Sequence, residues 1–106
     1  MTTLADIIEA PPTEYGIEYR VHATRRMFER GILGEDVERL LGSGQVIESY
    51  EDTLPFRHVL LNGKGATGRA LHVAVVVNLT EKRLSVITVY EPDPSKWTRN
   101  FSRRKP

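Results

Sequence analysis

From Gln45 to Glu91 the sequence repeats with a period of two, in short stretches divided by turn-forming residues. Within residues 70–78 the alternate positions hold aliphatic side chains, namely Leu71, Val73, Val75 and Val77. Alternate side chains of a strand share one face, so this pattern predicts a strand with one face in a core. Short strands joined by turns favour an antiparallel meander. A chain of 106 residues has room for only one such core.

Two short helices are expected before the meander. Residues 22–30 carry apolar side chains at helical spacing, and Gly31 is suited to end that helix. Gly34 is the expected N-cap of a second helix. The apolar stripe of the second helix contains Val37, Leu40 and Leu41. With a short strand at residues 17–21, this order predicts an α+β fold, with two short helices packed on one face of a four- to five-stranded, mainly antiparallel sheet.

The pattern divides the chain into an N-terminal extension (1–18), a single α+β domain (19–97) and a basic C-terminal tail (98–106). In the extension, residues 4–10 are expected to form a short helix that Pro11 ends. No stretch approaches the roughly 18 apolar residues of a membrane helix, and no secretory signal is visible. The chain holds no cysteine, which excludes disulfides and thiolate catalysis and fits a cytoplasmic protein.

The net charge of the chain is only +1, but the charge alternates in sign between segments. Residues 20–30 carry a net +3, residues 35–52 a net −5 and residues 95–106 a net +5. The basic segments either form a face that binds a polyanion or contact the acidic segments. The candidate nucleic-acid contacts in the last segment are Trp97, Arg99, Arg103 and Arg104. The tryptophan either stacks on a base or pins the tail to the domain.

The helix predicted at residues 22–30 carries the most informative polar pattern. His22, Arg26 and Arg30 are spaced at i, i+4 and i+8, which places them on one stripe. Arginine suits phosphate because its guanidinium donates paired hydrogen bonds and stays charged. A histidine on the same stripe is suited to move a proton near neutral pH. The alternative is a solvated basic face whose arginines pair with neighbouring acids.

Two residues of the predicted meander extend this set of candidates. Alternation places His72 on the strand face opposite the aliphatic one, where it is either a proton-transfer group or a satisfied structural side chain. Tyr90 ends the last strand, and alternation places Val86 on its side. The histidines, which are His22, His58 and His72, lack the spacing of a metal site, so no metal and no cofactor is predicted.

Several motifs occur in a fixed order: His22-Ala23, Arg26-Met27, Arg30-Gly31-Ile32, Glu35-Asp36-Val37, Val46-Ile47-Glu48, the run from Gly68 to Val73, and the run from Ile87 to Asp93 followed by Trp97. In this order they resemble the bacterial family called domain of unknown function 4258, over roughly residues 19–97. The resemblance implies the fold more than the activity. The helix–helix–meander order is in turn similar to that of the RelE/ParE toxin superfamily. Many of those toxins are metal-independent ribonucleases that act on ribosome-bound messenger RNA, and others act on gyrase.

The likeness to RelE/ParE toxins implies a toxin-like RNA-binding protein, and we expect a metal-independent endoribonuclease of a toxin–antitoxin system. Such cleavage needs a base, an acid and a cation for the phosphorane charge. The expected roles are proton transfer by His22 and His72, phosphate binding by Arg26 and Arg30, and orientation of the phosphate by Tyr90.

The expected partners are RNA or the ribosome and an antitoxin protein, with no membrane partner; the oligomeric state stays open. The alternative is a non-catalytic binding module that docks a protein partner or nucleic acid through its exposed sheet face and basic tail. An adjacent reading frame that encodes a small acidic or DNA-binding protein would favour the toxin hypothesis.

Overall fold

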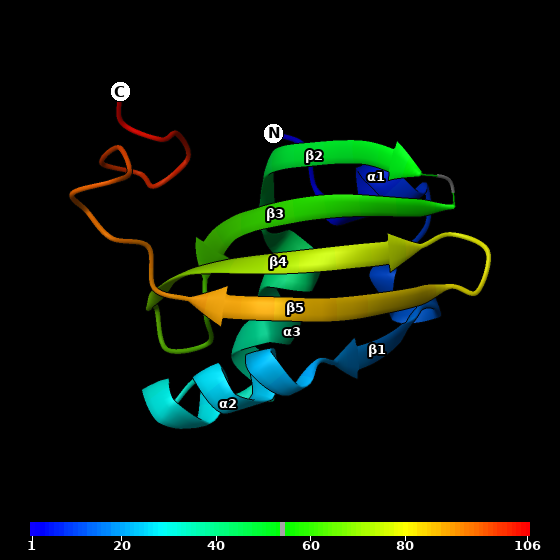
Figure 1. Ribbon diagram of the computed structural model, residues 1–106, viewed down its shortest axis with the longest axis horizontal. Coiled ribbons are helices and arrows are strands. Elements are labelled where there is room, and N and C mark those ends of the chain that lie inside the picture. Colours follow the sequence, from blue (N-terminus) through cyan, green and yellow to red (C-terminus); the bar gives the residue numbers. More distant parts are fainter. Residues whose placement is uncertain (54) are drawn as a thin grey trace.

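The computed structural model describes every residue of the chain except Leu54. Its helical elements are α1 (Leu4–Ile8), the 3-10 helix η1 (Pro12–Glu14), α2 (Val21–Arg30) and α3 (Gly34–Ser43). Its strands are β1 (Gly16–Tyr19), β2 (Gln45–Thr53), β3 (Phe56–Lys64), β4 (Ala70–Asn78) and β5 (Arg83–Tyr90). Figure 1 shows the sheet face-on, with α1 and α3 behind it and the C-terminal tail at one end.

The strands form one five-stranded sheet in the order β1-β5-β4-β3-β2. The strands from β2 to β5 are antiparallel to one another, as the meander predicts, whereas β1 lies parallel to β5. β1 pairs with β5 only from Arg83 to Val86, and α2 packs against the same strand (Figure 1). The predicted α+β class, with short helices and a mainly antiparallel sheet, is confirmed.

The core lies between the sheet and the helices. Its buried side chains include Leu71, Val73, Val75 and Val77 of β4 and Val37, Leu40 and Leu41 of α3. This confirms the predicted aliphatic face of the strand and the predicted stripe of the helix. Burying one such side chain stabilises the fold by about 1.5–3 kcal/mol. Because a one-residue slip would turn every one of them to the other face, this burial fixes the register of β4.

A β-bulge in β5 overturns one prediction from alternation. Val86 was expected on the same side as Tyr90, but it is fully buried in the core. Val75 pairs with Val86 whereas Ala74 pairs with Thr88, so Ile87 is an extra residue in β5. A bulge of this kind shifts the alternation by one residue. Thr88 and Tyr90 therefore lie on the face opposite the helices, without Val86.

The ends of the two longer helices follow local rules, with one correction. Gly31 ends α2 in the left-handed conformation at φ 64°, as predicted. Gly34 was expected to cap α3, but Leu33 occupies the cap position. The carboxylate of Asp36 accepts a hydrogen bond from the Leu33 amide (2.8 Å), which replaces a side-chain cap. It also accepts one from the amide of Ala66 (2.8 Å), so it ties the start of α3 to the β3–β4 loop.

The N-terminal segment packs into the same core as the rest of the chain. Leu4 and Ile8 of α1 and Tyr15 are buried in the core cluster. The Val46 amide donates a hydrogen bond to the Thr2 carbonyl oxygen (2.7 Å), which joins the segment to the edge of β2. Within the part of the chain that the structure describes, none of the helices has the length and apolar character needed to cross a bilayer.

Candidate functional site

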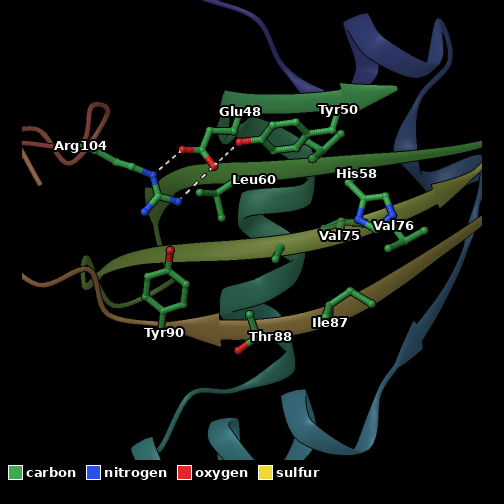
Figure 2. A pocket seen from close by; sticks show the side chains of 12 residues that line it. Glu48, Tyr50, His58, Leu60, Val75, Val76, Ile87, Thr88, Tyr90 and Arg104 are labelled. Atoms are coloured by element: carbon green, nitrogen blue, oxygen red, sulfur yellow. Dashed lines mark hydrogen bonds and ion pairs between the residues drawn. The ribbon is translucent and has the colours of Figure 1, made fainter. Parts of the chain in front are cut away.

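The face of the sheet opposite the helices, here called the open face, carries a groove with a volume of about 380 Å³. Its floor includes the apolar side chains Leu60, Ala74 and Val76, and its polar residues are Glu48, Tyr50, His58, Thr88, Tyr90 and Arg104. Figure 2 shows Arg104 and Tyr90 at one end of the groove and His58 at the other. A volume of this size falls within the range of about 300–1,000 Å³ that is usual for ligand sites.

Strand pairing brings the polar side chains of the groove together. Tyr50 of β2 pairs with His58 of β3, and His58 pairs with Val76 of β4. Glu48 pairs with Leu60 in the next row along the same face. Because directly paired residues hold their side chains on one face, β2 and β3 place a phenol and an imidazole side by side.

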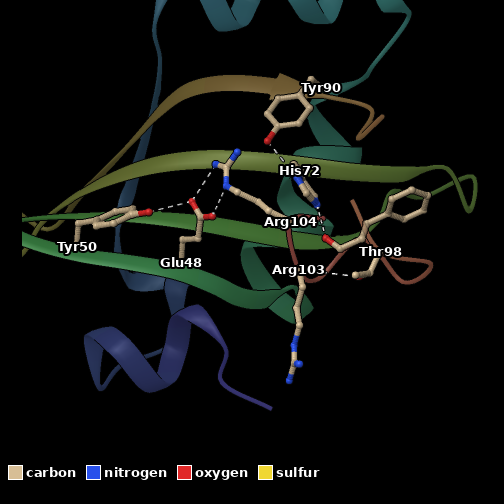
Figure 3. Close-up of polar contacts among 8 residues, drawn as sticks. Glu48, Tyr50, His72, Tyr90, Thr98, Arg103 and Arg104 are labelled. Atoms are coloured by element: carbon tan, nitrogen blue, oxygen red, sulfur yellow. Dashed lines mark hydrogen bonds and ion pairs between the residues drawn. The ribbon is translucent and has the colours of Figure 1, made fainter. Parts of the chain in front are cut away.

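One carboxylate organises the end of the groove next to the tail. Arg104 donates from Nε to Oε2 of Glu48 (2.9 Å) and from Nη2 to Oε1 (3.3 Å) (Figure 3). The Tyr50 hydroxyl donates to the same Oε1 (3.1 Å). The hydrogen bonds from Arg104 lower the pKa of Glu48, so this carboxylate is ionised at neutral pH. The tail and the groove are thus joined by a charged pair.

His72 lies beside this end of the groove and is fully buried. Its Nε2 lies 2.9 Å from the carbonyl oxygen of Phe101, and its Nδ1 lies 3.1 Å from the Tyr90 hydroxyl. Since a carbonyl only accepts, we assign the proton to Nε2, and the Tyr90 hydroxyl then donates to Nδ1. Burial lowers the pKa of His72 and raises the pKa of Tyr90, so both groups stay neutral near pH 7.

An aromatic cluster pins the start of the tail onto His72. The Trp97 ring meets the His72 ring edge-on, with centroids 4.5 Å apart, and Trp97 is itself buried. The guanidinium of Arg104 lies 4.7 Å from the centroid of the Trp97 ring, at cation–π distance. The sequence left two alternatives for Trp97, which were stacking on a base and pinning the tail to the domain. The packing against His72 corresponds to the second.

The predicted site residues fall into two groups. His72 and Tyr90 are brought together, whereas His22, Arg26 and Arg30 lie on α2 and are not among the described residues that line the groove. His22 and Arg30 are exposed, and Arg26 is half-buried. The structure therefore does not gather the five residues around one cavity.

Arg69 connects the C-terminal end of α2 to the residue that follows β5. Arg69 donates to the carbonyl oxygens of Arg30 (2.7 Å) and Gly31 (3.2 Å) and pairs with Glu91 (3.0 Å). The hydrogen bond from Arg69, with a smaller contribution from the charge of Arg30, lowers the pKa of Glu91. Arg69 thus ties α2 to the end of β5, next to Tyr90 but outside the groove.

The basic residues of the tail also separate. Arg104 reaches the groove, while the side chains of Arg99 and Arg103 are exposed outside it. Arg104 pairs with Glu48 of the acidic segment, so at this position a basic segment does contact an acidic one.

Three groove residues were missed by the sequence reasoning, namely Glu48, Tyr50 and His58. The alternation that placed His72 on the open face also applies to β2 and β3, and it was a usable signal for all three. Among the residues that the structure describes, no three His, Cys, Asp or Glu side chains gather as a metal site requires.

Comparison with known proteins identifies the family. Residues 19–91 match the family described as Domain of unknown function (DUF4258). No curated protein and no solved structure matches the chain. The likeness to RelE/ParE toxins therefore stays a prediction. The match runs from β1 to the residue after Tyr90, and the tail lies beyond it. Because the match covers well over half of the chain, this chain belongs to the DUF4258 family.

Proposed function

We propose that this chain is a toxin-like RNA-binding protein that takes a single-stranded RNA segment into the open-face groove and cleaves it without a metal. The observation that carries the proposal is the set of groups around one groove. An imidazole (His58), a guanidinium (Arg104) and two phenols (Tyr50 and Tyr90) all line it. Aromatic side chains stack on bases, and a guanidinium binds phosphate through paired hydrogen bonds.

These groups match the needs of metal-free RNA cleavage. The 2′-oxygen forms a bond to phosphorus while the bond from phosphorus to the 5′-oxygen breaks, which leaves a cyclic phosphate and a 5′-hydroxyl. A base takes the proton of the 2′-hydroxyl, and an acid gives one to the departing oxygen. We assign the base to His58 and stabilisation of the phosphorane charge to Arg104, which places the scissile phosphate between the two ends of the groove (Figure 2). The departing 5′-oxygen takes its proton from water. The Tyr90 hydroxyl donates its one proton to His72, so Tyr90 contributes its ring, on which a base next to that phosphate stacks.

Single-turnover cleavage of a labelled single-stranded RNA tests this assignment. We expect His58→Gln to lower the rate by about 10²- to 10⁴-fold, the usual contribution of a general acid or base. Arg104→Gln should also lower the rate, whereas Arg39→Gln should not, because Arg39 is exposed on α3 behind the sheet. Circular dichroism of each variant serves as the folding control.

The same assay distinguishes the groove from the helix stripe suggested by the sequence. A large loss in His22→Gln, together with a wild-type rate in His58→Gln, would move the site to α2. If the wild type neither cleaves nor binds RNA, with or without ribosomes, the proposal is wrong.

A second candidate function has support of its own, namely a binding module for a protein partner such as an antitoxin. The floor of the groove is apolar, through Leu60, Ala74 and Val76, and Tyr50 is 53% exposed at its rim. Apolar floors with aromatic rims suit peptide segments. Co-purification with the product of an adjacent reading frame, lost in a Leu60→Arg variant that stays folded, would favour this function.

A further inference from the structure

The C-terminal tail, residues 98–106, crosses one end of the open face and is here called the strap. Three of its residues form hydrogen bonds or an ion pair with the sheet. The Asn62 side chain donates to the carbonyl oxygen of Asn100 (3.0 Å). His72 donates to the carbonyl oxygen of Phe101 (2.9 Å). Arg104 pairs with Glu48 (2.9 Å), as Figure 3 shows. The strap therefore covers the part of the open face that holds His72.

The strap has a closed shape of its own. The Thr98 amide donates to the Arg103 carbonyl oxygen (2.8 Å), and the Lys105 amide donates to the Lys96 carbonyl oxygen (2.8 Å). Trp97 and Arg104 form an antiparallel bridge. The strap is therefore bonded back onto Lys96 and Trp97, and residues 96–105 form a closed hairpin that can move as one unit about the residues before Lys96.

The contacts between the strap and the sheet leave most of the basic side chains of the strap exposed to solvent, where they can bind an anion. Two of the three use its backbone carbonyls, so the side chains of Arg99 and Arg103 stay exposed. The third is an ion pair between Arg104, whose side chain is 65% exposed, and Glu48, whose side chain is 21% exposed, so a competing anion can reach the pair from its arginine side. Residues 95–106 carry five bases and no acid, so a polyanion is attracted to this segment.

We propose that the strap is a reversible cover of the RNA-binding face, and that an RNA phosphate lifts it by taking Arg104 from Glu48. This inference rests on the function proposed above. Lifting the strap uncovers His72 and extends the open-face groove past Tyr90, while Arg104 stays at the groove on the RNA phosphate that replaces Glu48 and the other arginines of the strap bind the RNA backbone. The family match ends at residue 91, so the cover lies outside the matched domain.

A reversible lock tests the inference in the full-length chain. The chain has no cysteine, so Asn62→Cys combined with Asn100→Cys introduces the only pair that can form a disulfide. The Asn62 side chain already reaches the backbone of residue 100, which places the two positions close together. Binding of a short fluorescein-labelled single-stranded RNA is measured by anisotropy before and after reduction, with loss of free thiols as proof of the lock.

We expect the oxidised form to bind the RNA at least about tenfold more weakly than the reduced form, because the lock removes the open state. The wild type, which has no thiol, should not respond to the reductant. Equal binding by the oxidised and reduced forms would overturn the cover while leaving the RNA proposal intact. Absence of binding in wild type and in both forms would overturn both proposals.

The single tryptophan provides a second readout that needs no substitution. Trp97 is only 5% exposed beneath the strap, so lifting the strap should make its fluorescence more sensitive to quenching by acrylamide. We expect quenching to increase when the same RNA is added to the wild type. RNA binding without any change in quenching would contradict a lifted strap.

Discussion

The two histidines that share the open face differ in what surrounds them. His58 on β3 is exposed and lines the groove, whereas His72 on β4 is fully buried. The alternation of side chains along the paired strands β3 and β4 places both histidines on the same face. The tail, which reaches His72 through Phe101, covers only one of them. Strand periodicity therefore decides the face of a side chain, but a segment distant in sequence decides whether that side chain is available to a ligand.

The tyrosines show the same difference. The Tyr90 hydroxyl donates to a buried imidazole nitrogen, and the Tyr50 hydroxyl donates to a carboxylate at the groove rim. One half of the open face is thus held by buried neutral hydrogen bonds and the other carries exposed or charged groups. The first half should contribute more to stability, and the second should contribute more to binding.

Removing His72 should have the largest effect on stability. His72→Ala leaves the Tyr90 hydroxyl and the Phe101 carbonyl without their partner and opens a cavity under Trp97. We expect a loss of about 3 kcal/mol in the free energy of unfolding, measured with urea. His58→Ala should cost clearly less, because this side chain is exposed and its removal opens no buried cavity. Equal losses in the two variants would contradict the division of the open face.

The tyrosines allow a matched and smaller test, because each change removes only a hydroxyl. Tyr90→Phe leaves the buried Nδ1 of His72 without a donor, so we expect a loss of about 1.5 kcal/mol in unfolding free energy. Tyr50→Phe removes a bond at an exposed rim, where Arg104 still holds Glu48, and should cost about 0.5 kcal/mol or less. The reverse order would mean that the groove half holds the fold.

The pH dependence of stability should reveal the buried imidazole. Burial lowers the pKa of His72 in the folded chain below the usual histidine value of 6.5, so near and below that pH the unfolded chain binds more protons. The contribution of neutral His72 to the free energy of unfolding is therefore fully present well above pH 6.5. It decreases as the pH falls toward the pKa of the folded chain, by at most about 1.4 kcal/mol per pH unit. Urea midpoints measured across this window should show the decrease.

His72→Gln is the control for that measurement, because glutamine keeps a donor and an acceptor but does not titrate. Its unfolding free energy should vary less with pH than that of the wild type between about pH 5 and 7. The loss from Glu48, whose pKa Arg104 lowers from its usual value of 4.5, begins near the acid end of this window and occurs in both proteins, so it does not distinguish them. An identical pH dependence in the two proteins would contradict a buried neutral His72.

Much of the fold could be predicted from the sequence because its signals are local. The aliphatic alternation of residues 70–78 predicted the core face of β4, and Gly31 predicted the end of α2. The bulge at Ile87 was missed because a bulge depends on how two strands pair, which one strand's pattern does not contain. The cap of α3 was misplaced by one residue because Asp36 supplies the hydrogen bond from inside the helix.

Less of the candidate site could be predicted. The sequence placed His72 on the correct face, but its contact with Tyr90 and its cover by Phe101, at a separation of 29 residues, were not predicted. The pair of Arg104 with Glu48 spans 56 residues, and no local pattern connects them. His58 was considered only as a metal ligand, although its place in β3 opposite Tyr50 follows from the same alternation.

Imidazole NMR signals of the wild-type chain test the central claim most directly, since they report all of its histidines in one sample. At about pH 6.5, the usual pKa of a histidine, His72 should give the signals of a neutral ring protonated on Nε2. Adding a single-stranded RNA should shift the signals of His58. An imidazolium signal from His72 at that pH, or RNA that shifts His22 and leaves His58 unchanged, would contradict the account.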